Sequence, residues 1–157
     1  MGRLAVAPAN QVAFDSLTRA VARELDAPWV CLALLDEEGR LIASSYGMPT
    51  ASALLISWSF AKHVIASSQP WVVDDRARDP VAVRTAAVRD GTVAAYCGLP
   101  ITDSLGLSVG TLSVMDRKPR EWSAAQLDVL RSLSAGFVAQ VEPGNGGMGD
   151  VHAPPLP

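Results

Sequence analysis

The chain has 157 residues, of which 49% are hydrophobic and 18% are charged, a composition that indicates one globular domain and excludes a disordered chain. Its formal net charge of −3 at pH 7 gives no electrostatic basis for binding nucleic acid. No apolar run approaches the roughly 20 residues that a membrane span needs, so we expect no membrane contact. The two cysteines, Cys31 and Cys97, have no metal-ligand spacing, which favours a reducing, cytoplasmic location.

The N-terminal part of the chain predicts one amphipathic helix after a loose leader. The leader covers residues 1–9, and Asn10 is a plausible N-cap. Pro28 ends the helix, because it pushes the residue before it out of the helical region. The apolar residues that recur at helical spacing between these two points are Phe14, Leu17, Val21 and Leu25.

The next part predicts two strands and a short helix. Residues 29–35 are apolar on both faces, which predicts a buried strand, whereas residues 40–46 are more polar, which predicts a strand nearer an edge. Residues 53–56 are read as a further short strand. Ser59 can cap a short helix over residues 60–67.

A charged segment follows a short strand at residues 71–73. Residues 77–90 predict a loop with one short helix at residues 83–89, and a loop of this length in a compact domain is often a lid or a binding loop. A polar or anionic ligand can be held by Asp74, Asp75, Arg76, Arg84 and Arg89, because guanidinium groups make bidentate contacts with a carboxylate or a phosphate. Solvated surface ion pairs explain the same residues equally well.

The rest of the chain is organised around a hairpin between Tyr96 and Asp116. Asp103 and Gly106, at the first and fourth positions of the turn, favour a type I turn. Both strands carry apolar or small residues on both faces. We therefore expect the hairpin in the middle of the sheet, with protein packed on each face.

A final helix follows the hairpin, with a capping box formed by Ser123 and Gln126. Trp122 and Leu127 have the spacing of a hydrophobic staple at the start of this helix. Residues 143–157 are rich in Gly and Pro, and we expect them to be disordered. The apolar face of the helix is Leu127, Leu130, Leu133, Phe137 and Val141.

Strands joined mainly by hairpins and short helical excursions predict an α+β fold with an antiparallel sheet. The two terminal helices also carry apolar residues outside the stripes that would pack on the sheet. Because exposed apolar patches commonly mark an interface, we expect a homodimer through these helices. The residues outside the stripes are Val12, Ala20, Val129 and Val138.

Five motifs, in their order and spacing, resemble those of a GAF domain. They are Ser-Phe at 59–60 followed by Lys-His-Val at 62–64, Pro-Trp-Val-Val-Asp-Asp-Arg-Ala at 70–77, Gly-Leu-Pro-Ile at 98–101, Val-Gly-Thr-Leu-Ser-Val-Met-Asp at 109–116 and Arg-Glu-Trp-Ser at 120–123. The resemblance implies one GAF-like domain over residues 10–142 with a GAF/PAS-like antiparallel sheet of five to six strands. It places the terminal helices on one face of the sheet, and short helices and loops over the other.

The resemblance implies a sensory or regulatory domain of bacterial signal transduction that binds an unknown small molecule and is not an enzyme on its own. GAF domains signal through their terminal helices, often as dimers, to an output protein such as a kinase. The GAF strand order also separates Cys31 from Cys97 by one strand, so these thiols should not form a disulfide. A ligand-free dimerisation or protein-docking module is the alternative. An enzyme of the free methionine sulfoxide reductase type is a further alternative, which the presence of only two cysteines disfavours.

Six residues are candidates for contact with the ligand. The large rings Trp58 and Tyr96 can stack on a ligand or fill the core. His63 can line the pocket or bind haem, and a half-buried helix histidine explains it as well. The resemblance disfavours haem, because haem-binding GAF domains carry their histidine just upstream of the hairpin and residues 90–95 contain none. It also disfavours a bilin, because bilin-binding GAF domains carry a Cys followed by His and glycine follows Cys97 here. The candidate residues are Trp58, His63, Asp75, Arg84, Tyr96 and Ser113.

Overall fold

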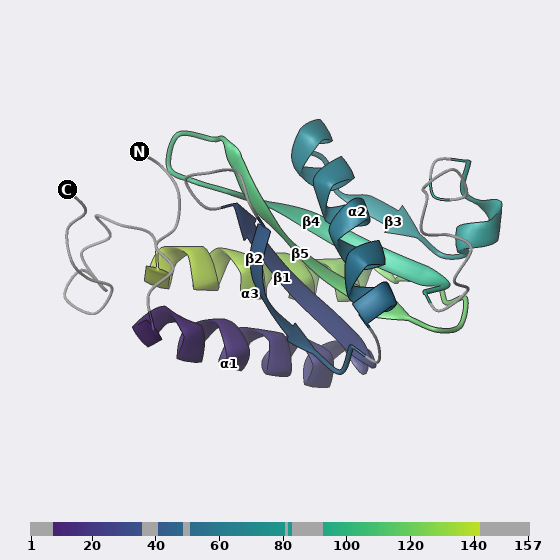
Figure 1. Ribbon diagram of the computed structural model, residues 1–157, viewed down its shortest axis with the longest axis horizontal. Coiled ribbons are helices and arrows are strands. Elements are labelled where there is room, and N and C mark those ends of the chain that lie inside the picture. The colour runs from purple at the N-terminus through teal and green to yellow at the C-terminus, as the bar shows by residue number, and fades with distance from the viewer. Residues whose placement is uncertain (1–7, 36–40, 49–50, 81, 83–92, 142–157) are drawn as a thin grey trace.

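The computed structural model describes residues 8–35, 41–48, 51–80, 82 and 93–141, which form an α+β fold, as the sequence predicts (Figure 1). The elements in chain order are α1 (Pro8–Leu25), β1 (Trp29–Leu35), β2 (Leu41–Tyr46), α2 (Ala51–Ser67), β3 (Trp71–Val73), the 3₁₀ turn η1 (Arg76–Arg78), β4 (Ala95–Thr102), β5 (Ser108–Asp116) and α3 (Ala124–Val141). Within these ranges, no helix is both long enough and apolar enough to span a bilayer. The expected short helix at residues 83–89, most of the leader and the 143–157 tail lie outside the described residues.

The strands form one antiparallel sheet in the order β2-β1-β5-β4-β3. The hairpin of β4 and β5 therefore lies inside the sheet, as its two apolar faces predict. β5 separates β1 from β4, so Cys31 is opposite Ser113 and Cys97 is opposite Val114. The predicted separation of the two cysteine strands is confirmed.

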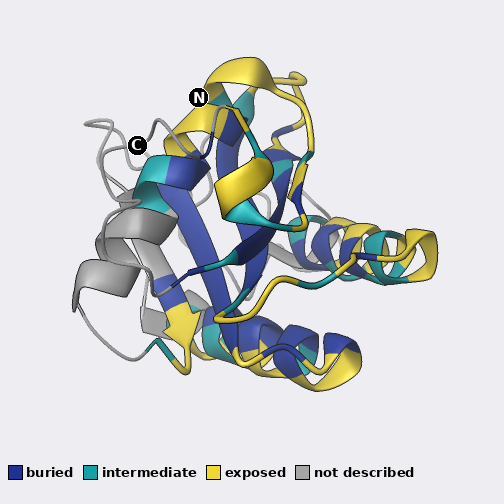
Figure 2. Ribbon diagram, turned by 90° about the vertical axis from the view of Figure 1, so that its right-hand side faces the viewer, coloured by how far each residue is buried: buried dark blue, intermediate teal, exposed yellow. Residues whose placement is uncertain are grey.

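The sheet is buried between two helical layers, with α1 and α3 on one face and α2 on the other (Figures 1 and 2). The strand residues alternate between these faces, which divides the core into two clusters. The cluster under α1 and α3 is larger and mainly aliphatic, and it includes Cys97. The cluster under α2, here called the α2-face cluster, consists of Trp29, Cys31, Ala33, Phe60, Ala61, Val64, Val73, Ala82, Val93, Tyr96 and Met115, with Met48, Trp58 and Trp71 packed against it.

The start of α2 differs from the prediction. A strand at residues 53–56 and a helix capped by Ser59 were expected, but one helix runs from Ala51 to Ser67. Ser59 therefore lies inside the helix and does not cap it. The physical reason is that residues 51–57 are nearly all apolar or small, and a short apolar run has no periodicity that distinguishes a helix from a buried strand.

The turn and the helix cap predicted around the hairpin are both present. Asp103 Oδ1 accepts the N–H groups of Leu105 and Leu107 at 2.9 and 3.0 Å, and Gly106 N donates to Asp103 O at 3.0 Å. Gly106 has φ 81°, the left-handed conformation that ends a three-residue hairpin loop. At the start of α3, Ser123 N donates to Gln126 Oε1 at 2.9 Å and Gln126 N donates to Ser123 Oγ at 3.1 Å, which confirms the capping box.

Arg120 joins the connection between β5 and α3 to the end of α1. Its guanidinium donates to Leu25 O and Asp26 O, both at 3.0 Å, and lies 3.3 Å from Asp116 Oδ2. It also stacks 4.3 Å from the ring centroid of Trp122. One side chain therefore supplies donors to the open carbonyls at the C-terminus of α1.

The terminal helices present a narrower exposed apolar surface than expected. Val129 and Val138 are partly buried against the core under α1 and α3, because that core extends around the flank of α3. Val12 on α1 is 69% exposed. An interface through these helices would therefore use Val12 and not the two α3 valines.

Candidate functional site

A chain of aromatic contacts fills the space between α2 and the β3–β4 edge of the sheet. Phe60 of α2 makes edge contacts with Tyr96 and Trp71, with ring centroids 4.8 and 5.1 Å apart. Trp71 continues the chain to the ring of His63, 4.3 Å away. These residues converge because the antiparallel register pairs Val73 with Tyr96 beneath α2. The rings pack against one another beneath α2, and they mark the candidate site.

Tyr96 lies at the centre of this arrangement and is fully buried. A Cβ added to Gly98 would come within 2.5 Å of the Tyr96 hydroxyl, so the ring occupies the space that glycine leaves. Burial raises the pKa of Tyr96 far above its ordinary value, and the nearby Ser113 hydroxyl opposes this shift only in part. That hydroxyl donates to Cys31 O at 3.3 Å. Within the described ranges, the Tyr96 hydroxyl forms no hydrogen bond of full geometry.

Trp58 and His63 contribute from α2. The Trp58 side chain packs on the α2-face cluster, and its Nε1 is buried with no hydrogen-bond partner among the described residues. His63 is exposed and contacts the cluster through Trp71. The structure therefore brings Trp58, Tyr96 and Ser113 together at one face and places His63 at its rim.

The acidic and basic candidates lie at the end of β3. Asp75 is half-buried and accepts the N–H of Ala77 at 3.0 Å, which caps η1. Arg84 lies outside the described residues. From the sequence, Arg76 was one of several arginines in this region and was not named as a site residue. In the structure its Nε and Nη1 atoms are buried, and the described part of the chain gives them no hydrogen-bond partner.

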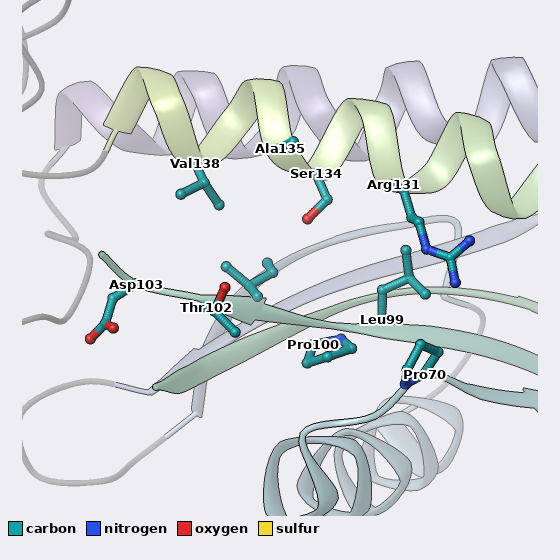
Figure 3. Close-up of a pocket in the computed structure, with 10 residues that line it drawn as sticks. Pro70, Leu99, Pro100, Thr102, Asp103, Arg131, Ser134, Ala135 and Val138 are labelled. Atoms are coloured by element: carbon teal, nitrogen blue, oxygen red, sulfur yellow. The ribbon is translucent and has the colours of Figure 1, made fainter. Parts of the chain in front are cut away.

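A hollow lies on the opposite face of the sheet, between α3 and β4 (Figure 3). This groove of about 670 Å³ has Arg131 and Pro70 at one end and Asp103 at the other. Ser134, Ala135 and Val138 of α3 form one wall, and residues Leu99–Thr102 form the other. The predicted site did not include this groove. The groove lies beside the part of β4 that β3 does not pair with, because β3 is short and its pairing with β4 reaches only Gly98.

The cysteines contribute packing. Both are buried thiols, and they face opposite sides of the sheet. Burial raises the pKa of Cys97 to about 12, which leaves almost none of it as the reactive thiolate at neutral pH. In the described part of the chain, no group of three or more His, Cys, Asp or Glu side chains is placed to hold a metal ion.

Comparison with known proteins agrees with this architecture. No curated protein matches the chain. Among solved structures, it is similar to the GAF domain of a phosphoenolpyruvate-protein phosphotransferase from Coxiella burnetii (15% identity, 85% of this chain and 83% of that one, TM-score 0.64). It is also similar to a GAF domain of Synechocystis sp. in its photoproduct state (16%, 82% and 90%, 0.63) and to a GAF domain/HD domain protein from Geobacter sulfurreducens (15%, 83% and 90%, 0.62).

These similarities concern the fold alone. The match to a family model is evidence from the sequence. The model of the GAF domain matches residues 10–141, which include every element described above except the first two residues of α1. The match is to the family that the sequence motifs resemble. The chain belongs to the GAF domain family.

Proposed function

We propose that this chain is a small-molecule sensory domain of bacterial signal transduction, not catalytic on its own, and that its ligand binds at the α2 face. The observation that carries the proposal is the pair of buried polar atoms Trp58 Nε1 and Tyr96 Oη. Neither has a hydrogen-bond partner of full geometry in the described residues. Buried polar groups in proteins are nearly always satisfied, and a ligand with acceptors for both atoms would supply what the described residues do not.

The energetic argument favours a ligand over a closed core. A buried donor without a partner costs about 1–3 kcal/mol, and phenylalanine would fill the space of Tyr96 without that cost. The cost is offset when a ligand accepts hydrogen bonds from both groups. The neighbouring structures are consistent with a signalling role, since one is a photoproduct state and another belongs to a phosphotransferase. We place the domain in the cytoplasm, upstream of an output protein.

The second candidate is a ligand-free docking or dimerisation module. The contacts of Phe60 and Trp71 with Tyr96 favour it, because rings that fill the space beneath α2 leave less room for a ligand. A homodimer through α1 and α3 is compatible with either candidate. The two candidate functions differ in whether the Tyr96 hydroxyl forms a hydrogen bond to a ligand.

Replacing Tyr96 by Phe separates the candidates, since it removes only that hydroxyl. The proposal predicts that wild-type chain purified without denaturation carries a bound small molecule in native mass spectrometry. Tyr96→Phe should lose that mass, and its ligand-free form should be at least as stable as ligand-free wild type. Tyr46→Phe, at an exposed position on β2, is the matched control and should retain the mass. A wild type without bound mass, together with a Tyr96→Phe variant of lower stability, would favour the docking module.

A further inference from the structure

Two of the three guanidinium nitrogens of Arg76 are buried, although the residue as a whole is only partly buried. Its Nε and Nη1 atoms are buried, and the described residues give them no hydrogen-bond partner. A guanidinium has five N–H donors and no acceptor, and it stays protonated in proteins. Burying the N–H donors of such a cation without acceptors for them is unfavourable. The position therefore calls for an anion.

The carboxylates near Arg76 already accept hydrogen bonds from the backbone. Asp75 Oδ1 accepts the N–H of Ala77 at 3.0 Å and caps η1. Asp74 Oδ1 accepts the N–H of Trp122 at 3.3 Å. These contacts hold both carboxylates in local structure, and neither forms a hydrogen bond to the buried Arg76 nitrogens.

Arg76 adjoins the α2-face cluster. Its backbone N donates to Ala94 O at 2.7 Å, which fixes η1 beside the start of β4, two residues before Tyr96. Val73 and Ala82, which precede and follow η1 in the chain, are both buried in the cluster. The unpartnered nitrogen atoms of Trp58 and Arg76 can only donate hydrogen bonds, and the Tyr96 hydroxyl can donate one as well. A ligand that satisfies all three must be rich in acceptors.

We propose that the ligand of the α2 face is an organic anion whose carboxylate or phosphate group binds Arg76. Its remaining acceptors lie toward Tyr96 and Trp58. This inference rests on the proposed function, because it names the chemical class of the ligand for that same site. Arg78, on the same turn but exposed, takes no part in binding.

The test compares Arg76→Gln with Arg78→Gln, which change the charge equally two residues apart. Isothermal titration of the full chain with inorganic phosphate and with succinate, at constant ionic strength, measures anion binding directly. We expect saturable binding of at least one anion to wild type and to Arg78→Gln. In Arg76→Gln the affinity should fall roughly 10- to 100-fold, as expected for the loss of a charged hydrogen-bond donor. Equal affinity in Arg76→Gln and wild type, or no saturable binding to wild type, would overturn the inference.

If Arg76→Gln does not fold, a second variant tests the same inference. Arg76→Lys keeps the charge but loses the planar set of donors, so it should bind more weakly than wild type, and unchanged binding counts against the inference. The Tyr96→Phe experiment is independent of these titrations. A co-purified mass that depends on Tyr96 but not on Arg76 leaves the sensory function standing and refutes the anionic ligand. Anion binding through Arg76 without any dependence on Tyr96 refutes the α2-face site itself.

Discussion

Arg120 provides the sharpest test of how the terminal helices are held to the sheet. Arg120→Ala removes two charged hydrogen bonds to Leu25 O and Asp26 O, the contact with Asp116, and the stacking on Trp122. The side chain is only 20% exposed, so solvent weakens these contacts little. Each hydrogen bond contributes roughly 1 kcal/mol net, and stacking and the ion pair contribute about 0.5 kcal/mol each. We expect the free energy of unfolding to fall by about 3 kcal/mol.

Urea unfolding followed by tryptophan fluorescence measures this change, with Arg117→Ala as the control. Arg117 is exposed and lies 5.4 Å from the ring centroid of Trp29, so its removal should cost less than about 1 kcal/mol. Arg120→Lys should recover only part of the loss, because one ammonium group cannot reach all the acceptors of a guanidinium. If Arg120→Ala costs no more than Arg117→Ala, the junction does not hold α1 to the sheet and the reasoning is refuted.

Three further perturbations test other parts of the fold. Gly98→Ala should cost about 1–3 kcal/mol in urea unfolding, because the new Cβ would lie 2.5 Å from the Tyr96 hydroxyl; an unchanged midpoint would show that this ring moves freely. Hydrogen bonds from Ser44 and Gln11 lower the pKa of Asp15, so its ionised form adds stability above the unfolded pKa, and that stability is lost as the pH falls through the folded value. Asp15→Asn should therefore lower the free energy of unfolding at neutral pH and flatten its fall toward about pH 3, whereas an unaltered pH profile would contradict this assignment. Val12→Glu should shift a wild-type dimer to monomer in sedimentation without changing circular dichroism, and a monomeric wild type would remove the case for the helix interface.

Much of the fold could be predicted from the sequence because its signals are local. The apolar alternation of β4 and β5, the turn at Asp103 and Gly106, and the capping box of Ser123 each depend on residues within a few positions. The extent of α2 could not be predicted in this way, since an apolar run without periodicity fits a strand as well as a helix.

The candidate site was harder to predict because it depends on burial. The rings Trp58 and Tyr96 could be named from their size and chemistry, and the structure places both at the α2-face cluster. The sequence cannot show that two guanidinium nitrogens of Arg76 are buried while Arg78, two residues later, is exposed. It also cannot show that Val129 packs against the core, because a helix position at the edge of the apolar stripe is buried only if the neighbouring layer extends that far.

A crystal structure of the chain purified without denaturation tests the central claim most directly. The claim is that a small molecule supplies the partners missing from Trp58 Nε1 and Tyr96 Oη. We predict non-protein density beneath α2, with acceptor atoms within hydrogen-bond distance of both groups. A closed core in which protein groups or water satisfy both atoms, with no density for a ligand, would contradict the account.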